Sequence, residues 1–346
     1  MRQNNSFSET TISIKEKVDF LKQPDVYPEY VNEVKTKETH MSWVFLAGNF
    51  VYKLKKPIKY KFQDLSTIEL RYRNCLEEVR LNQALAKEIY LKVLPLVLGD
   101  DGKLYLEKEG KIVDWLIKMK RIPDEHMLDY LIKSNQVEEE QIIDAAKFLA
   151  NFYKKSIPFE IFPDQYMKKL EQEIIDTYKE LLNQHFDLPL IQIESIFKIL
   201  LHYLFKHFTL FDKRIFTRRI IEGHGDLRPE HIRIVPYPVI IDCLEFSKEL
   251  RILDAAEELS YLAMECEKLG NSRVGQLFFD TYVKESGDLI PGDLILFYKG
   301  KRAFLRAYLV ARHMAEPAYK DKSKWFSSAN AYLNLAEKYC KEIEAT

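Results

Sequence analysis

The stretch Ile221–Phe246, IEGHGDLRPEHIRIVPYPVIIDCLEF, decides how the rest of the chain is interpreted. A polar His-Gly-Asp turn precedes two short apolar runs that are separated by Pro-Tyr-Pro. Prolines around a short connection between β-branched residues predict two strands joined by a tight turn. We expect this hairpin to bring Asp226 and His231 close to Asp242. Two carboxylates and an imidazole suit a metal-assisted reaction, in which one group takes a proton and the others hold a cation.

These residues resemble the catalytic and metal-binding loops of the aminoglycoside phosphotransferase and choline kinase group. Its signature is HGDxxxxN, followed after a short hairpin by an Ile-Asp pair, and His224-Gly225-Asp226 and Ile241-Asp242 match it. The strings HGDLRPEH and DCLEF are most similar to those of an uncharacterised bacterial branch. The resemblance implies a protein-kinase-like fold that binds ATP, or GTP, with Mg²⁺ or alternatively Mn²⁺.

The resemblance also implies roles for the residues of the turn. Asp226 would orient the attacking hydroxyl and act as its weak base. His224 would support the loop through hydrogen bonds rather than react. Arg228, two residues after Asp226, could contact a phosphate or an acidic acceptor, or could simply be an exposed charge beside the site.

For the metal, the resemblance assigns Asp242, with His231 and Glu245 as further candidates. His231 departs from the pattern because an Asn carbonyl suits Mg²⁺ whereas imidazole suits softer ions. Four outcomes stay open for it: a His-Asp pair that still holds one cation, binding by Asp242 alone, weak or lost catalysis, or a purely structural histidine. Glu245 could serve a metal or a cationic substrate, and Glu257 and Glu258 would suit a cationic acceptor too.

Upstream, the resemblance aligns the string NFVYKL with the strand whose lysine holds the nucleotide phosphates. Lys53 is that lysine, and its ammonium would be fixed by a rigid strand. The alternative is a solvated strand lysine, since Lys55 and Lys56 are close by. Its carboxylate partner on the following helix would be Glu78, with Glu77 as the alternative.

Three further nucleotide-binding candidates come from the same alignment. Thr39 lies in the segment 37–40, where many kinases have a glycine-rich loop, although this segment contains no glycine. Met119 lies just before the expected hinge at residues 120–124, beside which the adenine would stack, and Ile122 lies within it. Either of them could equally belong to the core.

Local patterns predict the elements around these residues. Helical spacing covers 14–21, and Gly48-Asn49 between two apolar runs predicts a hairpin. Ser66-Thr67-Ile68-Glu69 has the form of a capping box, so a helix should begin near Thr67 and continue to about Ala86. The residues Gly99-Asp100-Asp101-Gly102 should form another hairpin tip, and helical periodicity dominates from His126 onward, including 253–268, 293–315 and 325–344.

We therefore expect an α+β, bilobal, protein-kinase-like fold. Residues 1–33 would be a helical extension, and 34–120 a small antiparallel-sheet lobe that binds the nucleotide phosphates. Residues 121–346 would form a larger, mainly helical lobe with the catalytic and metal-binding loops.

The amino-acid composition limits the kinds of partner and cellular location that we expect for the chain. The 346 residues suffice for a substantial core, and 47% hydrophobic with 30% charged residues is ordinary for a globular protein. A net charge of −1 gives no reason to expect nucleic acid or a membrane as a partner. The opening MRQNNSFSET lacks the apolar core of a signal peptide, and four scattered cysteines suggest reduced thiols, so we expect a cytoplasmic protein of undefined oligomeric state.

Three functions remain to be distinguished. The leading hypothesis is an ATP-dependent phosphotransferase that acts on a hydroxyl of an unidentified small molecule. One alternative is a weakly active or inactive kinase-like regulator that binds a nucleotide. The other is a metal-dependent hydrolase with His224, Asp226 and His231 as ligands, although H-x-D-x-x-x-x-H is not a strong ligand spacing.

Overall fold

The computed structural model describes residues 12–60, 63–182, 186–315 and 322–346. The chain divides into two compact units, named here the sheet unit and the helical unit. The sheet unit holds the described residues up to Pro123 together with Ile240–Ser247, and the helical unit holds Asp124–Val239 and the described residues from Lys248 onward. We expected everything after residue 120 to belong to the helical region, but the Asp242 segment belongs to the sheet unit. The opening residues, on which the signal-peptide expectation rests, lie outside the described ranges.

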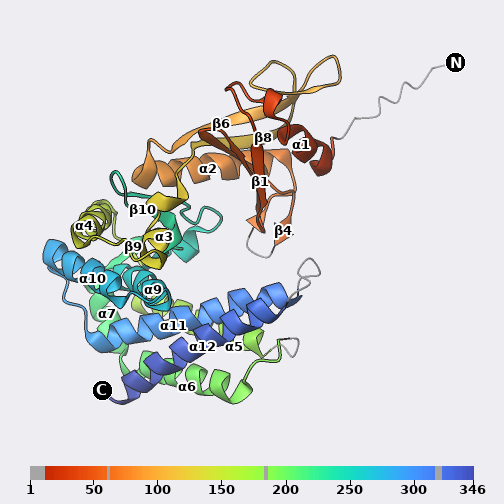
Figure 1. Ribbon diagram of the computed structural model, residues 1–346. Coiled ribbons are helices and arrows are strands. Elements are labelled where there is room, and N and C mark those ends of the chain that lie inside the picture. Colours follow the sequence, from red (N-terminus) through yellow and green to blue (C-terminus); the bar gives the residue numbers. More distant parts are fainter. Residues whose placement is uncertain (1–11, 61–62, 183–185, 316–321) are drawn as a thin grey trace. The chain divides into compact units, whose positions relative to one another are not determined.

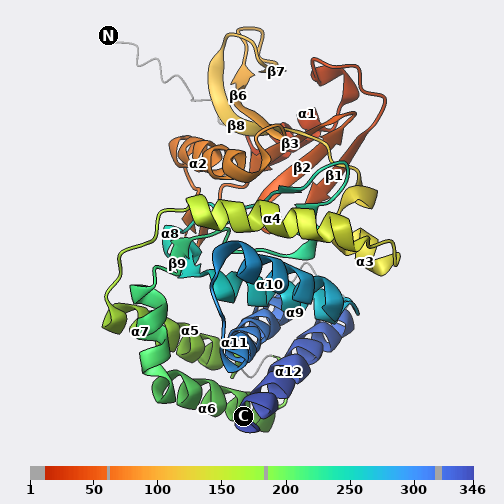
Figure 2. The same ribbon diagram turned by 90° about the vertical axis from the view of Figure 1, so that its left-hand side faces the viewer.

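Among the described residues, the sheet unit is built on an antiparallel sheet with strand order β1-β2-β3-β8-β6-β7 (Figures 1 and 2). Its strands are β1 Val34–Glu38, β2 Ser42–Ala47, β3 Phe50–Lys55, β6 Tyr90–Leu98, β7 Leu104–Leu106 and β8 Lys111–Lys120. Two short strands, β4 Lys59–Tyr60 and β5 Gln63–Asp64, form a separate pair. Both predicted hairpin tips are confirmed, and Gly48 takes a φ of +59° that glycine adopts without strain.

Two helices pack on this sheet. Helix α1 (Ile14–Leu21) spans the predicted residues and is capped by Ser13. Helix α2 (Ile68–Ala86) begins as predicted, but its cap is Thr67, which accepts a hydrogen bond from the N–H of Leu70, whereas Ser66 bonds to Asp64 instead. The predicted capping box starting at Ser66 is therefore wrong by one residue. A short 3-10 turn, η1 Pro24–Val26, follows α1.

Successive side chains of β3 point to opposite faces of the sheet, alternately toward α1 and toward α2. Tyr52 and Leu54 are fully buried in a core that also contains Val18 and Leu21 of α1. Lys53 and Lys55, at the positions between, carry their ammonium groups to Glu78 of α2. The strand therefore has one apolar face and one charged face, and the charged face carries the site.

A buried ion triad ties the two helices to β8. The carboxylate of Asp114 accepts from Nζ of Lys17 at 2.8 Å and from Nε and Nη2 of Arg71 at 2.8 and 2.9 Å. All three side chains are less than one tenth exposed. Because Arg71 lies on the same helix as Glu78, this triad also fixes the helix that carries the site.

We expect Asp114→Asn to destabilise the protein strongly. It would leave the Lys17 and Arg71 cations buried without their carboxylate, which typically costs about 3–5 kcal/mol of unfolding free energy. Urea denaturation followed by circular dichroism measures the change. The control is Glu139→Gln, which breaks an exposed pair with Arg273 and should change little. Equal denaturation midpoints for the two variants would contradict the structural role of the triad.

The helical unit contains the elements that follow Pro123 (Figure 2). Its helices are α3 Leu128–Lys133, α4 Glu139–Lys155, α5 Pro163–Leu181, α6 Leu190–Lys206, α7 Phe208–Phe216, α8 Lys248–Arg251, α9 Ala255–Lys268, α10 Ser272–Ser286, α11 Gly292–Ala311 and α12 Ser323–Glu344. Short 3-10 turns are η2 Asp124–His126, η3 Pro229–His231 and η4 Arg312–Ala315. Within the described residues, no helix has the combination of length and apolar character that crossing a membrane requires.

Short strands carry the functional turn of this unit. Strand β9 (Ile220–Glu222) pairs antiparallel with β12 (Ile252–Asp254), and the predicted hairpin forms between β10 (Ile232–Arg233) and β11 (Val239–Ile240). The sequence did not predict β12, which delays the start of α9 by two residues. Asp254 caps α9 and is held by two bonds of 2.7 Å from Arg214. The His-Gly-Asp turn therefore follows a strand fixed at the entry to α9.

Candidate active site

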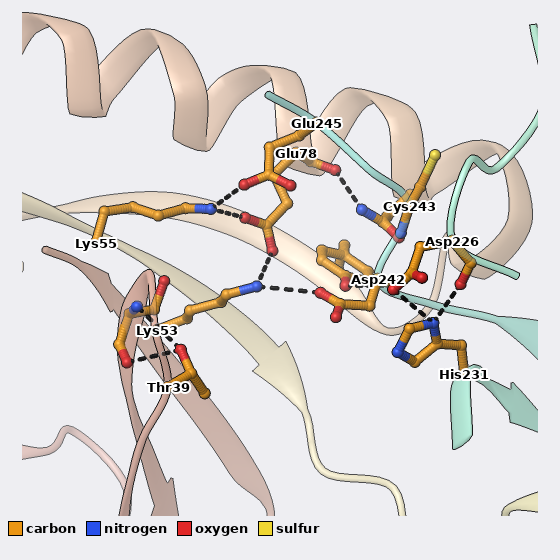
Figure 3. A network of polar contacts seen from close by, with 12 residues as sticks. Thr39, Lys53, Lys55, Glu78, Asp226, His231, Asp242, Cys243 and Glu245 are labelled. Carbon is orange, nitrogen blue, oxygen red and sulfur yellow. Dashed lines mark hydrogen bonds and ion pairs between the residues drawn. The ribbon is translucent and has the colours of Figure 1, made fainter. Parts of the chain in front are cut away.

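In the sheet unit, Glu78 is the centre of an ion network (Figure 3). Its buried carboxylate accepts from Nζ of Lys53 at 2.8 Å and from Nζ of Lys55. Glu77, the alternative partner, instead binds Arg80 through two contacts of 2.7 Å. The structure thus joins Lys53 to Glu78, one of the two candidate pairings.

Asp242 completes the same network. Its Oδ1 lies 3.2 Å from Nζ of Lys53, and its side chain is about half exposed. Its N–H donates to the hydroxyl of Tyr90, and the next N–H, of Cys243, donates to the side-chain oxygen of Asn82. Asp242 has a φ of +63°, a left-handed conformation that is uncommon for a residue with a side chain. These two anchors hold the carboxylate in place despite that conformation.

Glu245 has a different partner from the one that we expected. Its carboxylate pairs with Nζ of Lys55, whose side chain is fully buried. Lys55 therefore bridges Glu78 and Glu245, and ties the segment after Asp242 to β3. A carboxylate committed to a buried ammonium is less available to a metal or a cationic substrate.

The charges of this network keep each other ionised. Burial would lower the pKa of Lys53, but the Asp242 and Glu78 carboxylates outweigh it and raise that pKa well above 10.5. Burial would raise the pKa of Glu78, yet the two lysines bring it below its ordinary value. Lys53 is therefore a permanent ammonium held by two carboxylates, a group suited to binding phosphate oxygens.

The other nucleotide candidates have these positions. Thr39 closes the turn between β1 and β2, where its hydroxyl donates to the carbonyl of Ser42 at 2.9 Å and accepts from the N–H of Ser42 at 3.0 Å. Met119 is buried on β8, opposite Val51 and Tyr90. Ile122 is half-buried after the end of that strand. Their roles in nucleotide binding stay predictions.

In the helical unit, Glu258 of α9 holds the His-Gly-Asp turn. Its buried carboxylate accepts from the N–H groups of His224 and Gly225 at 3.1 and 2.7 Å, and from the hydroxyl of Tyr153 at 2.8 Å. A Cβ added at Gly223 would lie 2.8 Å from this carboxylate, so the close approach requires glycine there. Glu258 therefore organises the turn rather than offering its charge to a cationic acceptor.

The side chains of the turn converge on Asp226. The hydroxyl of Tyr261 donates to Oδ1 at 3.0 Å, and Nε and Nη2 of Arg228 donate to Oδ2 at 3.2 and 3.0 Å. His224 is buried, and its Nδ1 accepts from the N–H of Asp226 at 3.3 Å, a hydrogen bond within the turn. Nδ1 of His231 lies 2.8 Å from the carbonyl oxygen of Asp226 (Figure 3).

Positive charge surrounds this carboxylate. Burial raises the pKa of Asp226, but the neighbouring positive charge, that of Arg228 foremost, outweighs burial and brings the pKa below its ordinary value. The carboxylate is therefore ionised at neutral pH and can accept a hydrogen bond from a hydroxyl group, or a proton late in a reaction.

Sequence analysis missed several residues of the Glu78 network and of the His-Gly-Asp turn, although some of them have sequence positions that relate them to residues it named. Lys55 is two residues from Lys53 on the same face of a strand, and Asn82 is one helical turn from Glu78. Tyr261 follows Glu258 by three residues on α9, so the two side chains share a face of that helix. Arg306 and Tyr90 had no comparable signal.

Among the described residues, no group of three or more His, Cys, Asp or Glu side chains could hold a metal ion. The hydrolase hypothesis required His224, Asp226 and His231 to converge on one ion. Instead, Nδ1 of each histidine contacts the backbone of Asp226, and Arg228 contacts the other ring nitrogen of His231. These contacts do not favour a hydrolase.

Curated relatives give no activity for comparison. No protein-family model matches the chain. An uncharacterized protein of Mycobacterium tuberculosis (strain H37Rv) and another of Mycobacterium bovis are each 30% identical to the chain over 290 residues. The match covers 79% of this chain and 54% of each relative. The chain thus spans about half the length of the curated relatives that it matches.

Solved structures identify the fold. A choline/ethanolamine kinase family protein from Mesorhizobium loti matches with a TM-score of 0.56 at 16% identity, covering 95% of both chains. A thermostable mutant of aminoglycoside phosphotransferase APH(4)-Ia gives 0.55 at 9% identity, over 92% of this chain and 97% of the other. LicA in complex with AMP gives 0.52 at 17% identity, over 95% and 100%. The chain therefore has the protein-kinase-like fold of the choline kinase and aminoglycoside phosphotransferase family, in which an antiparallel sheet precedes a mainly helical region.

Proposed function

We propose that the chain transfers the γ-phosphoryl group of ATP, or of GTP, to a hydroxyl group of a small molecule. The observation that carries the proposal is the network in which Lys53 joins Glu78 and Asp242. Phosphoryl transfer needs a fixed cation on the phosphates and a carboxylate for a divalent metal, and this network contains both. The shared fold supports it, because neighbours of this fold are kinases of small molecules and one of them holds AMP.

In the proposed mechanism the sheet unit holds the nucleotide. Lys53 binds phosphate oxygens, and Glu78 fixes the position of its ammonium. Asp242 fits Mg²⁺ or Mn²⁺, because it offers a half-exposed carboxylate oxygen of the kind that these ions prefer. When bound, the ion would neutralise charge on the transferring phosphoryl group.

The helical unit activates the acceptor. Asp226 accepts a hydrogen bond from the acceptor hydroxyl and takes its proton as the new P–O bond forms, while the bond from the γ-phosphorus to the bridging oxygen breaks and the nucleoside diphosphate leaves. Tyr261 and Arg228 fix the carboxylate, while Glu258 fixes the backbone of the turn. Both aspartates keep well-defined partners, which favours an active enzyme over the nucleotide-binding regulator without turnover.

The carboxylates that were candidates for binding a cationic acceptor give little support for such an acceptor. Glu245 pairs with Lys55, and Glu257 pairs with Lys301 and Arg302 at 2.9 and 2.8 Å. Glu258 binds the turn. Because each of them has a partner inside its own unit, a cationic acceptor is not preferred.

Isotope transfer tests the proposed reaction even while the acceptor is unidentified. The chain is incubated with Mg²⁺, a pool of small metabolites and ATP labelled at either the γ- or the α-phosphate. We expect only the label of the γ-phosphate to appear in a new compound other than a nucleotide. Transfer of the α-label would instead indicate nucleotidyl transfer, and the absence of both products together with no ADP would contradict the kinase.

The pH dependence of turnover should report the environment of Asp226. The positive neighbours keep its pKa below the ordinary value, so activity should persist as the pH falls through the usual carboxyl range. Arg228→Met removes one of these charges and should move the acidic limb of kcat/KM to higher pH. Profiles from about pH 4 to pH 7 measure the shift. An unchanged or downward-shifted limb would contradict the assignment of Asp226 as the base.

A further inference from the structure

The guanidinium of Arg228 lies against the groups of the turn that could hold a cation. Its Nε and Nη2 donate to Oδ2 of Asp226, and Nη2 lies 3.2 Å from Nε2 of His231. Its Nη1 pairs with Glu230. A positive group held by three partners already occupies the space beside Asp226 and His231.

The histidine is oriented to receive this guanidinium. Nδ1 of His231 lies 2.8 Å from the carbonyl oxygen of Asp226, an atom that can only accept, so we assign the ring proton to Nδ1 (Figure 3). Nε2 then carries a lone pair and accepts from Nη2 of Arg228. A divalent ion at Nε2 would have to displace the partly buried guanidinium of Arg228, which has a charge of the same sign.

The carboxylate of Asp226 offers such an ion little more. Oδ2 accepts from Arg228, and Oδ1 accepts from the hydroxyl of Tyr261 at 3.0 Å. Arg306 of α11 adds positive charge in the same surroundings. Imidazole is also a poorer ligand than a carbonyl oxygen for Mg²⁺. The residues of this turn therefore do not fit a divalent cation.

We propose that the chain uses one divalent cation, held by Asp242, and that Arg228 supplies the positive charge at the catalytic turn in place of a second cation. This inference rests on the proposed function. His231 is then a positioning residue, because it fixes Arg228 and the backbone of Asp226 instead of ligating a metal.

Counting bound ions tests this inference. Equilibrium dialysis against Mn²⁺ and a saturating non-hydrolysable ATP analogue gives the excess Mn²⁺ on the protein side. We expect one ion per chain, lost in Asp242→Asn. Two ions in the unmodified chain would overturn the inference and leave the proposed kinase intact. No nucleotide-dependent ion at all would overturn both.

Matched variants identify the group that excludes the second ion. Arg228→Lys keeps the charge and should still bind one ion, whereas Arg228→Met removes the charge and should gain a second, weaker ion. His231→Asn, which introduces the residue of the related signature, should stay at one ion because the guanidinium remains. A single ion in Arg228→Met would show that the guanidinium is not what excludes it. Thermal melting by circular dichroism verifies that each variant is folded, and the count for the unmodified chain decides even if one is not.

Discussion

Replacement of Asp226 by asparagine is expected to lower kcat for phosphoryl transfer by about 10²–10⁴-fold, the usual contribution of a positioned general base. Asparagine keeps the size of the side chain, and its amide oxygen can still accept from Arg228 while its NH2 group faces the hydroxyl of Tyr261. It cannot accept the proton of the acceptor hydroxyl. The KM for ATP should change little, because the proposed nucleotide contacts belong to the sheet unit. Initial rates of ADP release with the acceptor found by label transfer measure both constants.

The matched control is Glu230→Gln. Glu230 shares Arg228 with Asp226 but is more exposed, so its neutral variant should keep most of the activity. Similar losses of kcat in the two variants would mean that the turn needs its overall charge rather than a base at Asp226. Full activity in Asp226→Asn would remove Asp226 from the mechanism.

Replacement of Lys53 and Lys55, the two lysines on the charged face of β3, one at a time should separate catalysis from stability. Lys53→Met is expected to lower kcat/KM for ATP by about 10²–10³-fold, as the loss of one preorganised electrostatic group does. Lys55→Met leaves Lys53 on Glu78 but deprives Glu245 of its buried partner, which typically costs about 3–5 kcal/mol of unfolding free energy. Steady-state kinetics and urea denaturation of both variants measure the two effects.

The result that would contradict this assignment is an exchange of the two phenotypes. Loss of ATP use in a well-folded Lys55→Met, with normal kinetics in Lys53→Met, would make Lys55 the phosphate-binding residue. The geometry favours Lys53, whose side chain is partly exposed and contacts Asp242, whereas Lys55 is fully enclosed.

Local rules predicted most of the sheet unit. Gly48-Asn49 and residues 99–102 have turn composition, and the alternating strands around them left few other arrangements. Helix α1 spans its predicted residues because the spacing of its apolar side chains and the proline after it agree. The cap of α2 is Thr67 rather than the predicted Ser66, because the Ser66 hydroxyl donates to Asp64 in the preceding strand.

The helical unit was harder to predict where elements are short or depend on distant partners. Strand β12 exists because it pairs with β9, some thirty residues earlier in the chain, and no local pattern reveals such pairing. Helix α10 was not predicted at all. Its apolar residues meet α4 and α9, so its stability comes from packing rather than from strong local signals.

The candidate residues of the site and the pairing of Lys53 with Glu78 could be proposed from the sequence, but most of the other contacts could not. The strings around Asp226 and Asp242 named the two aspartates, and the strand named Lys53. The partners of Glu245, Glu258 and Arg228 depend on side-chain directions that only the folded chain defines. Charge type alone suggested metal or substrate contacts for residues that instead bind one another.

Calorimetric titration of ATP with Mg²⁺ or Mn²⁺ tests the central claim most directly. We expect metal-dependent binding to the unmodified chain, loss of the metal-dependent part in Asp242→Asn, and its retention in Asp226→Asn. This pattern would assign nucleotide and metal binding to the network of Lys53, Glu78 and Asp242. No ATP binding to the unmodified chain with either metal would contradict the kinase and the nucleotide-binding regulator together.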